Sequence, residues 1–204
     1  MNLSHPENLQ IKNPDGTAAT GGSQEWYPTR SQRASGCGPT AASNIIWYMT
    51  LSRAAPQTLC DTGNGEKERF VELMREMFGY VKPGMGGVNT SAIFADGVVR
   101  YASARGETLT PHKLEIPRAR RKRPDIASVG DFILAGLQND SPVAFLNLSN
   151  GKLAKPDSWH WVTIIKYDPD SASAGIIDQG SEHDVPLKTW LDTTLLGGAL
   201  VYLL

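Results

Sequence analysis

The sequence predicts an α+β protein in which helices come first and strands follow. Apolar residues recur with helical spacing up to about residue 138, whereas continuous apolar runs typical of buried strands begin at Val143. The chain shows no alternation of strand, helix and strand, which a parallel sheet would require. The order of the segments therefore indicates helices packed on a mainly antiparallel sheet.

Apolar spacing and turn residues together set the predicted elements. The helix over 66–78 has the clearest stripe, with Phe70, Met74 and Met77 on one face and Gly79 near its end. A loop around Pro56 precedes it. The predicted helices cover about 37–51, 66–78, 90–104, 128–138 and 186–192, and the predicted strands about 143–148, 159–167, 175–178 and 199–204.

Residues 1–30 are predicted to form an irregular N-terminal arm. Asn13-Pro14-Asp15-Gly16 and Gly21-Gly22-Ser23 are turn or loop signals, and no apolar periodicity connects them. Trp26 and Tyr27 are expected to anchor this arm on the body of the protein.

Composition and charge are those of an ordinary globular chain. Its 204 residues carry a net charge of −1, with 40% hydrophobic and 20% charged residues, so neither nucleic acid nor an anionic membrane is expected as a partner. The one strong charge run, Arg118–Arg123, is interpreted as a solvated loop rather than a nucleic-acid site. The N-terminus does not read as a signal peptide, and no apolar run of about 18 residues occurs. We therefore expect a cytoplasmic protein without a membrane segment, with secretion by another route left open.

The stretch from Ser35 to Asn44 reads as a loop that runs straight into a helix, with Cys37 at the start. Gly36 and Gly38 let other groups approach the backbone closely, and Pro39 suits the first turn of a helix. Cys37 then lies beside unpaired N–H groups and the positive end of the helix dipole, which stabilise a thiolate and can receive an oxyanion. A nucleophile is one interpretation and an inert core cysteine is the other, so a partner base decides between them.

Of the four histidines, His160 is the best candidate for that base. It stands at the start of an apolar strand between Trp159 and Trp161, where a merely packed histidine is the alternative interpretation. His5 lies in the arm and His112 in a predicted loop, which makes them weaker candidates.

Asp178 is the candidate group that orients the His160 imidazole. It ends the next predicted strand, and the two residues would share a face of the sheet if the register keeps even parity. Glu182 and Asp184 are the alternatives for this role, and His183 beside them is a competing histidine.

Other chemistries find less support in the residue pattern. The two cysteines, Cys37 and Cys60, do not make a disulfide framework, although a single bridge between them would disable the nucleophile. No CxxC, HxxxH or HExxH spacing indicates a metal, and no G-x-S-x-G motif indicates a serine hydrolase. No metal and no cofactor are expected.

Two stretches of the chain carry a family resemblance. The first is Gly36-Cys37-Gly38-Pro39-Thr40-Ala41-Ala42-Ser43-Asn44, and the second is His160-Trp161-Val162-Thr163-Ile164-Ile165-Lys166-Tyr167-Asp168. They resemble the nucleophile helix and the histidine strand of papain-like cysteine peptidases. The likeness is closest to the branch of the bacteriocin-leader-processing peptidases and their stand-alone bacterial relatives. There, Ile176-Ile177-Asp178 matches the place of the orienting aspartate, and Asn139-Asp140-Ser141-Pro142-Val143 resembles the preceding helix-to-strand step.

The resemblance implies a papain-like domain over 31–204. A helical lobe at about 31–125 would carry Cys37, and a β lobe at about 126–204 would carry His160 and Asp178. The family usually places an oxyanion-hole glutamine six residues before the cysteine, whereas Gln32, the candidate here, lies five before Cys37.

The implied function is a cysteine peptidase-type hydrolase that cleaves a peptide or amide bond in a peptide or protein substrate. An acyltransferase on the same fold and an inactive peptide-binding relative are the alternatives. The sequence does not define the substrate or the oligomeric state.

Overall fold

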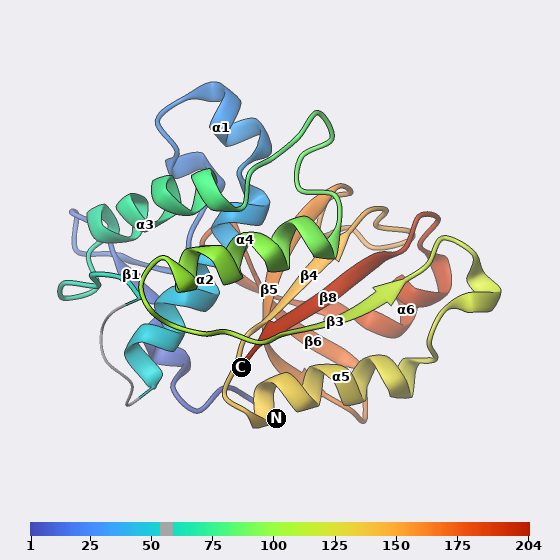
Figure 1. Cartoon of the computed structure of the whole chain (residues 1–204). Helices are drawn as coiled ribbons and strands as arrows, with labels where there is room; N and C mark the ends of the chain where they lie inside the picture. Colours follow the sequence, from blue (N-terminus) through green and yellow to red (C-terminus); the bar gives the residue numbers. More distant parts are fainter. Residues whose placement is uncertain (54–58) are drawn as a thin grey trace.

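The computed structural model describes residues 1–53 and 59–204 and confirms the α+β class (Figure 1). The loop predicted around Pro56 lies outside the described residues. The helices are α1 (Arg30–Ser35), α2 (Cys37–Ser52), α3 (Lys67–Tyr80), α4 (Ser91–Ser103), α5 (Ile126–Gln138) and α6 (Leu187–Thr193), with short 3₁₀ turns η1 (Pro6–Leu9), η2 (Gln24–Trp26) and η3 (Arg120–Lys122). The strands are β1 (Gln10–Lys12), β2 (Ala18–Thr20), β3 (Pro111–Ile116), β4 (Val143–Asn147), β5 (His160–Asp168), β6 (Ser173–Asp178), β7 (Ser181–Pro186) and β8 (Gly198–Leu203).

A six-stranded antiparallel sheet in the order β3-β8-β4-β5-β6-β7 forms the centre of the molecule. Helices cover both of its faces, with α2, α3 and α4 on one and α5 and α6 on the other (Figure 1). Strand β4 shows the alternation that this requires, because Ala144 and Leu146 belong to the core under α2 while Val143 and Phe145 belong to the core under α5.

The predicted helices and strands are all found, with ends shifted by a few residues, whereas α1, the β1–β2 hairpin and both edge strands of the six-stranded sheet were missed. Strand β7 is exposed at most of its positions, and β3 begins with a proline and alternates charged with apolar residues. Polar residues and proline are typical of edge strands, and they hide the apolar signal that identifies buried strands. As a result, His112 lies on a strand rather than in a loop. Strand β3 falls within the range predicted for the helical lobe, yet it pairs with β8.

The N-terminal arm holds η1, the β1–β2 hairpin and η2, and it packs on the body. Leu9 and Ile11 are fully buried. The Tyr27 hydroxyl donates to the Met74 carbonyl at 3.0 Å, and Trp26 meets Phe70 edge to face. The expectation that Trp26 and Tyr27 anchor the arm is confirmed.

Helix α2 lies at the middle of the molecule and is buried from Gly38 to Thr50. Because it packs against both α3 and β5, its first turn is held in a fixed place relative to the sheet. Within residues 1–53 and 59–204, no helix combines the length and apolar character needed to cross a membrane.

Candidate active site

Cys37 is the first residue of α2, as the sequence predicts. The glycines on either side of it are required by close neighbours. A Cβ on Gly36 would collide with the Tyr27 ring, and a Cβ on Gly38 would lie 2.8 Å from the Val88 side chain. The tight packing of these two glycines fixes the cysteine at the helix start, where the N–H groups of the first turn have no intrahelical partner.

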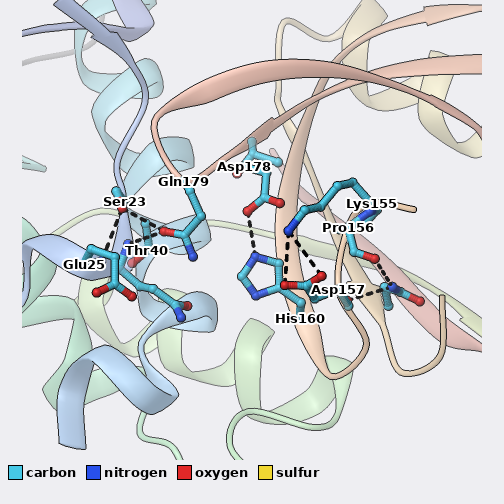
Figure 2. A network of polar contacts seen from close by, with 12 residues as sticks. Ser23, Glu25, Thr40, Lys155, Pro156, Asp157, His160, Asp178 and Gln179 are labelled. Atoms are coloured by element: carbon cyan, nitrogen blue, oxygen red, sulfur yellow. Dashed lines mark hydrogen bonds and ion pairs between the residues drawn. The ribbon is translucent and has the colours of Figure 1, made fainter. Parts of the chain in front are cut away.

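His160 and Asp178 are brought together by the pairing of β5 with β6. Thr163 pairs with Ile177, so Asp178 lies diagonal to His160 with the same parity. The His160 Nε2 and an Asp178 carboxylate oxygen are 2.8 Å apart (Figure 2). The Asp178 side chain is buried, with 6% of its surface exposed, and the His160 side chain is largely buried, with 13% exposed.

The surroundings of His160 favour its charged form. Burial alone lowers the pKa of His160, but hydrogen bonding to Asp178 and to Cys37 outweighs burial and raises the pKa to about 9. An imidazolium at neutral pH is the counterion that a cysteine thiolate needs. The two groups that hold the proton on the ring are therefore the predicted nucleophile and the predicted orienting carboxylate.

Cys37, His160 and Asp178 line one pocket, together with Gln24 and Asn44. The free space in it is only about 10 Å³, so the side chains fill it. Sequence reasoning missed Gln24, which belongs to the arm and has no local motif around it. Its Oε1 atom is buried and has no hydrogen-bond partner among the described residues.

Gln32 lies elsewhere, on α1. Its Oε1 accepts a hydrogen bond from the Thr29 hydroxyl at 2.8 Å, and its backbone N–H donates to the same hydroxyl. The described residues that line the pocket of Cys37 do not include Gln32.

Glu182, Asp184, His5 and His112 have other partners, and His183 lies on the exposed strand β7. Glu182 and Asp184 both form ion pairs with Lys166, at 2.7 and 3.2 Å. His112 stacks on Tyr202 with ring centroids 4.6 Å apart, and His5 contacts Glu7. Around His160, Asp178 is therefore the carboxylate within hydrogen-bond distance.

The two cysteines are free thiols, so the bridge between Cys37 and Cys60 does not form. Cys60 contacts the Thr50 hydroxyl at 3.3 Å, and burial raises the pKa of its thiol to about 11. It lines a different pocket, which makes it an internal reference for the reactivity of Cys37.

Comparisons with known proteins give only distant likenesses. No protein-family model and no curated protein matches the chain. A double glycine motif protease from an AMS/PCAT transporter, crystallised with its leader peptide, is 13% identical over 82% of both chains, with a TM-score of 0.40. The Pseudomonas avirulence protein AvrPphB is 12% identical over 84% of this chain and 92% of its own, with a TM-score of 0.39.

A third solved structure is the N-terminal peptidase-like domain of a toxin secretion ATP-binding protein from Vibrio parahaemolyticus. It is 11% identical over 79% of this chain and 95% of its own, with a TM-score of 0.29. Two of the three names describe a protease or a peptidase. Because the identities and TM-scores are this low, the chemistry of the site is argued from the geometry of its own residues.

Proposed function

We propose that the chain is a cysteine peptidase-type hydrolase, with Cys37 as nucleophile, His160 as base and acid, and Asp178 as orienting group. The observation that carries the proposal is the largely buried His160, which lies 2.8 Å from Asp178 and shares a pocket with a cysteine at the start of α2. Nucleophile, base and orienting group in contact are the signature of nucleophilic catalysis. The single domain over 31–204, the peptide or protein substrate and the cytoplasmic location belong to the same proposal.

The reaction follows from the atoms that remain free. Because Nε2 of His160 is engaged with Asp178, Nδ1 is the ring nitrogen left to take the Cys37 proton. The thiolate attacks the carbonyl carbon, and the imidazolium donates its proton to the leaving amine as the C–N bond breaks. A water molecule, deprotonated by His160, then attacks the thioester, releases the acid and restores the thiol.

The oxyanion formed in both steps needs donors near the Cys37 sulfur. The backbone N–H of Cys37 is one. Gln32 was predicted as the second, and the bond from Thr29 leaves its Nε2 free to donate. Gln24 fits better, because it lines the pocket of Cys37, which Gln32 does not, and its amide nitrogen is a hydrogen-bond donor.

A second, wider recess adjoins Cys37 and offers room for a substrate side chain. Its volume is about 400 Å³, and none of its lining residues is charged. Trp159, which is 56% exposed, and Met85, which is fully exposed, flank it. The residues that line it are Ala34, Ser35, Cys37, Gly84, Met85, Gly86, Gly87, Val88, Leu146, Leu148 and Trp159.

Exposed large apolar side chains beside a reactive group indicate a surface that a ligand covers. Trp159 is also held at a φ of +58°, a strained conformation for a bulky residue, immediately before His160. We therefore propose substrates with a bulky apolar side chain within about two residues of the scissile bond.

The experiment that tests the proposed function is alkylation by iodoacetamide from pH 5 to 10, followed for each cysteine by peptide mass spectrometry. Cys37 is expected to react rapidly below pH 7, whereas Cys60 reacts slowly there because burial raises the pKa of its thiol to about 11. His160→Ala should remove the fast reaction at low pH and leave Cys60 unchanged. Slow reaction of Cys37 at all pH values below 8 would favour the inactive peptide-binding alternative.

Product analysis with added amine or thiol acceptors separates hydrolysis from acyl transfer. Hydrolysis predicts the free acid as the main product, whereas an acyltransferase gives the acceptor conjugate.

A further inference from the structure

The N-terminal arm touches each of the elements that carry the proposed catalytic residues. The relevant part is residues 20–24, named here the arm segment. Its Gly22 N–H donates to Asn44 Oδ1 at 2.9 Å, and the Asn44 amide donates to the Thr163 hydroxyl at 3.0 Å. Asn44 lies on α2 behind Cys37, and Thr163 lies on β5 behind His160.

The same segment binds the turn that follows Asp178. The Thr20 N–H donates to the Gly180 carbonyl at 2.9 Å, and the Gly180 N–H donates to the Gly22 carbonyl at 3.1 Å. The Ser23 hydroxyl donates to Gln179 Oε1 at 2.7 Å, and the Gln24 N–H donates to the same oxygen at 3.2 Å (Figure 2). Since a backbone N–H can only donate, the second bond fixes which end of the Gln179 amide faces the arm.

The turn itself does not favour its own conformation. Asp178 pairs with Ser181 across a two-residue hairpin turn in which Gln179 has a φ of +50° and Gly180 a φ of +78°. Such turns prefer asparagine, aspartate or glycine at the first of these positions, so a glutamine there is strained. Strain of this kind persists where surrounding contacts determine the conformation.

The arm segment is held in turn by its own close packing. A Cβ on Gly21 would lie 2.8 Å from both the Asn44 amide oxygen and the Ile177 side chain, and a Cβ on Gly22 would overlap the Phe70 ring. The two glycines thus let the segment pass between α2, α3 and β6. The loop signal read from Gly21-Gly22-Ser23 is therefore a requirement of tertiary packing.

We propose that Gln179, which accepts two hydrogen bonds from the arm segment, is a positioning residue that holds the Asp178 carboxylate in place beside His160. This inference rests on the proposed function for its catalytic consequence, but the geometry it describes can be measured without a substrate. It also makes residues 20–24 part of the active unit, although the sequence places them outside the predicted domain.

The test is Gln179→Gly, which deletes the gripped side chain and relieves the backbone strain. We expect kcat/KM to fall on the order of 10- to 100-fold, since small displacements of catalytic groups have effects of this size. The pKa of His160, followed by NMR titration of its ring, should fall below the wild-type value of about 9 because Asp178 is less well placed. Asp178 and Cys37 are the titratable groups that act on this ring.

The matched control is Ala172→Gly, at the other end of β6. Ala172 also has a positive φ of +50°, so glycine relieves the same strain there without deleting a contact to the arm. This control should keep both activity and the His160 pKa. Gln179→Glu retains an acceptor for both donors, and its added negative charge favours the imidazolium, so the His160 pKa should not fall below the wild-type value. Ser23→Ala, which removes one of the two bonds, should give a smaller shift than Gln179→Gly.

The outcomes separate this inference from the proposed function. If Gln179→Gly behaves like Ala172→Gly in the NMR titration, the positioning role is overturned, whatever the activity. If the His160 pKa moves as expected but Cys37 is unreactive at low pH, the positioning role stands and the peptidase proposal fails. Additivity of Gln179→Gly and Asp178→Asn in the titration would also contradict the inference, because Gln179 is inferred to act through Asp178.

Discussion

Cys37 and Cys60 border hollows of similar volume, but the side chains around the two thiols differ. Both thiols are free and partly buried, and each borders a hollow of about 400 Å³. The hollow beside Cys60 is lined by Asp61, Arg69, Glu72, Glu76 and Arg105, whereas the recess beside Cys37 has no charged lining residue. The charges near Cys60 are largely paired with one another, as Arg69 is with Asp61 and Glu72.

A thiol beside a hollow is not enough to make a reactive site. Burial is the largest influence on the Cys60 thiol and raises its pKa, although the hydrogen bond with the Thr50 hydroxyl and the charge of Arg105 act in the opposite direction. Cys37 has the start of a helix on one side and a buried histidine–carboxylate pair on the other. The partner base, and not the burial of the sulfur, is what distinguishes the two cysteines.

The largest expected effect comes from deleting each thiol in turn. Cys37→Ala should lower kcat on the order of 10⁵-fold, because the nucleophile is lost, while Cys60→Ala should leave kcat within about twofold. The measurement is hydrolysis of a fluorogenic peptide, with circular dichroism as the check on folding. Comparable losses in the two variants would contradict the assignment of the nucleophile.

Removing the carboxylate tests what makes Cys37 different. Asp178→Asn should lower kcat on the order of 10²- to 10⁴-fold, since the imidazole loses its orienting anion. The pKa of His160 should fall from about 9, so the alkaline limb of the pH profile of kcat/KM moves to lower pH. A profile unchanged in position would show that Asp178 does not act on His160.

The same pKa has a consequence for stability, and its sign is fixed. A histidine whose pKa is raised from 6.5 to about 9 by folding stabilises the native state fully below pH 6.5 and loses that contribution as pH rises through 9. The melting temperature of the wild type should therefore fall between pH 6.5 and 9 more than that of His160→Gln. Calorimetry in buffers of equal ionic strength measures this, and parallel curves would count against the ion pair.

Two glutamines, Gln24 and Gln32, are candidates for the side-chain donor to the oxyanion. Gln24→Ala should lower kcat on the order of 10- to 100-fold with little change in KM, because the amide that lines the pocket is lost. Gln32→Ala should change kcat by less, since its side chain is held by Thr29 on α1. The reverse order would restore Gln32 to the role that its place in the sequence predicts.

The smallest expected effect concerns substrate preference at the recess beside Cys37. Its lining residues are uncharged, whereas those of the hollow beside Cys60 are mostly charged. Peptides with leucine near the scissile bond should be cleaved faster than matched peptides with glycine or glutamate, by about tenfold in kcat/KM. Trp159→Ala should reduce the preference for leucine over glycine several-fold through KM. Leu195→Ala, which removes another exposed apolar side chain that does not line the recess, is the matched control.

Much of the fold could be predicted from the sequence because buried elements carry their own signal. The helix from Cys37 and the strand from His160 are buried over most of their length, and the spacing of their apolar residues distinguishes a helix from a strand. The edge strands β3 and β7 could not be found in this way, because they pair on one side only and most of their side chains are exposed or half-buried, so they lack a clear apolar pattern.

In the candidate site as well, the features that depend on local sequence could be predicted, and those that depend on long-range contacts could not. Local sequence determined that Cys37 begins a helix between two glycines and that His160 begins a strand, because turn residues and apolar periodicity act over a few positions. Whether Asp178, Glu182 or Asp184 meets His160 depended on the order and register of β5, β6 and β7, which are set by long-range pairing. Tertiary structure alone placed Gln24 in the pocket and the arm segment against the turn after Asp178, since contacts between such distant residues leave no periodic signal in the chain.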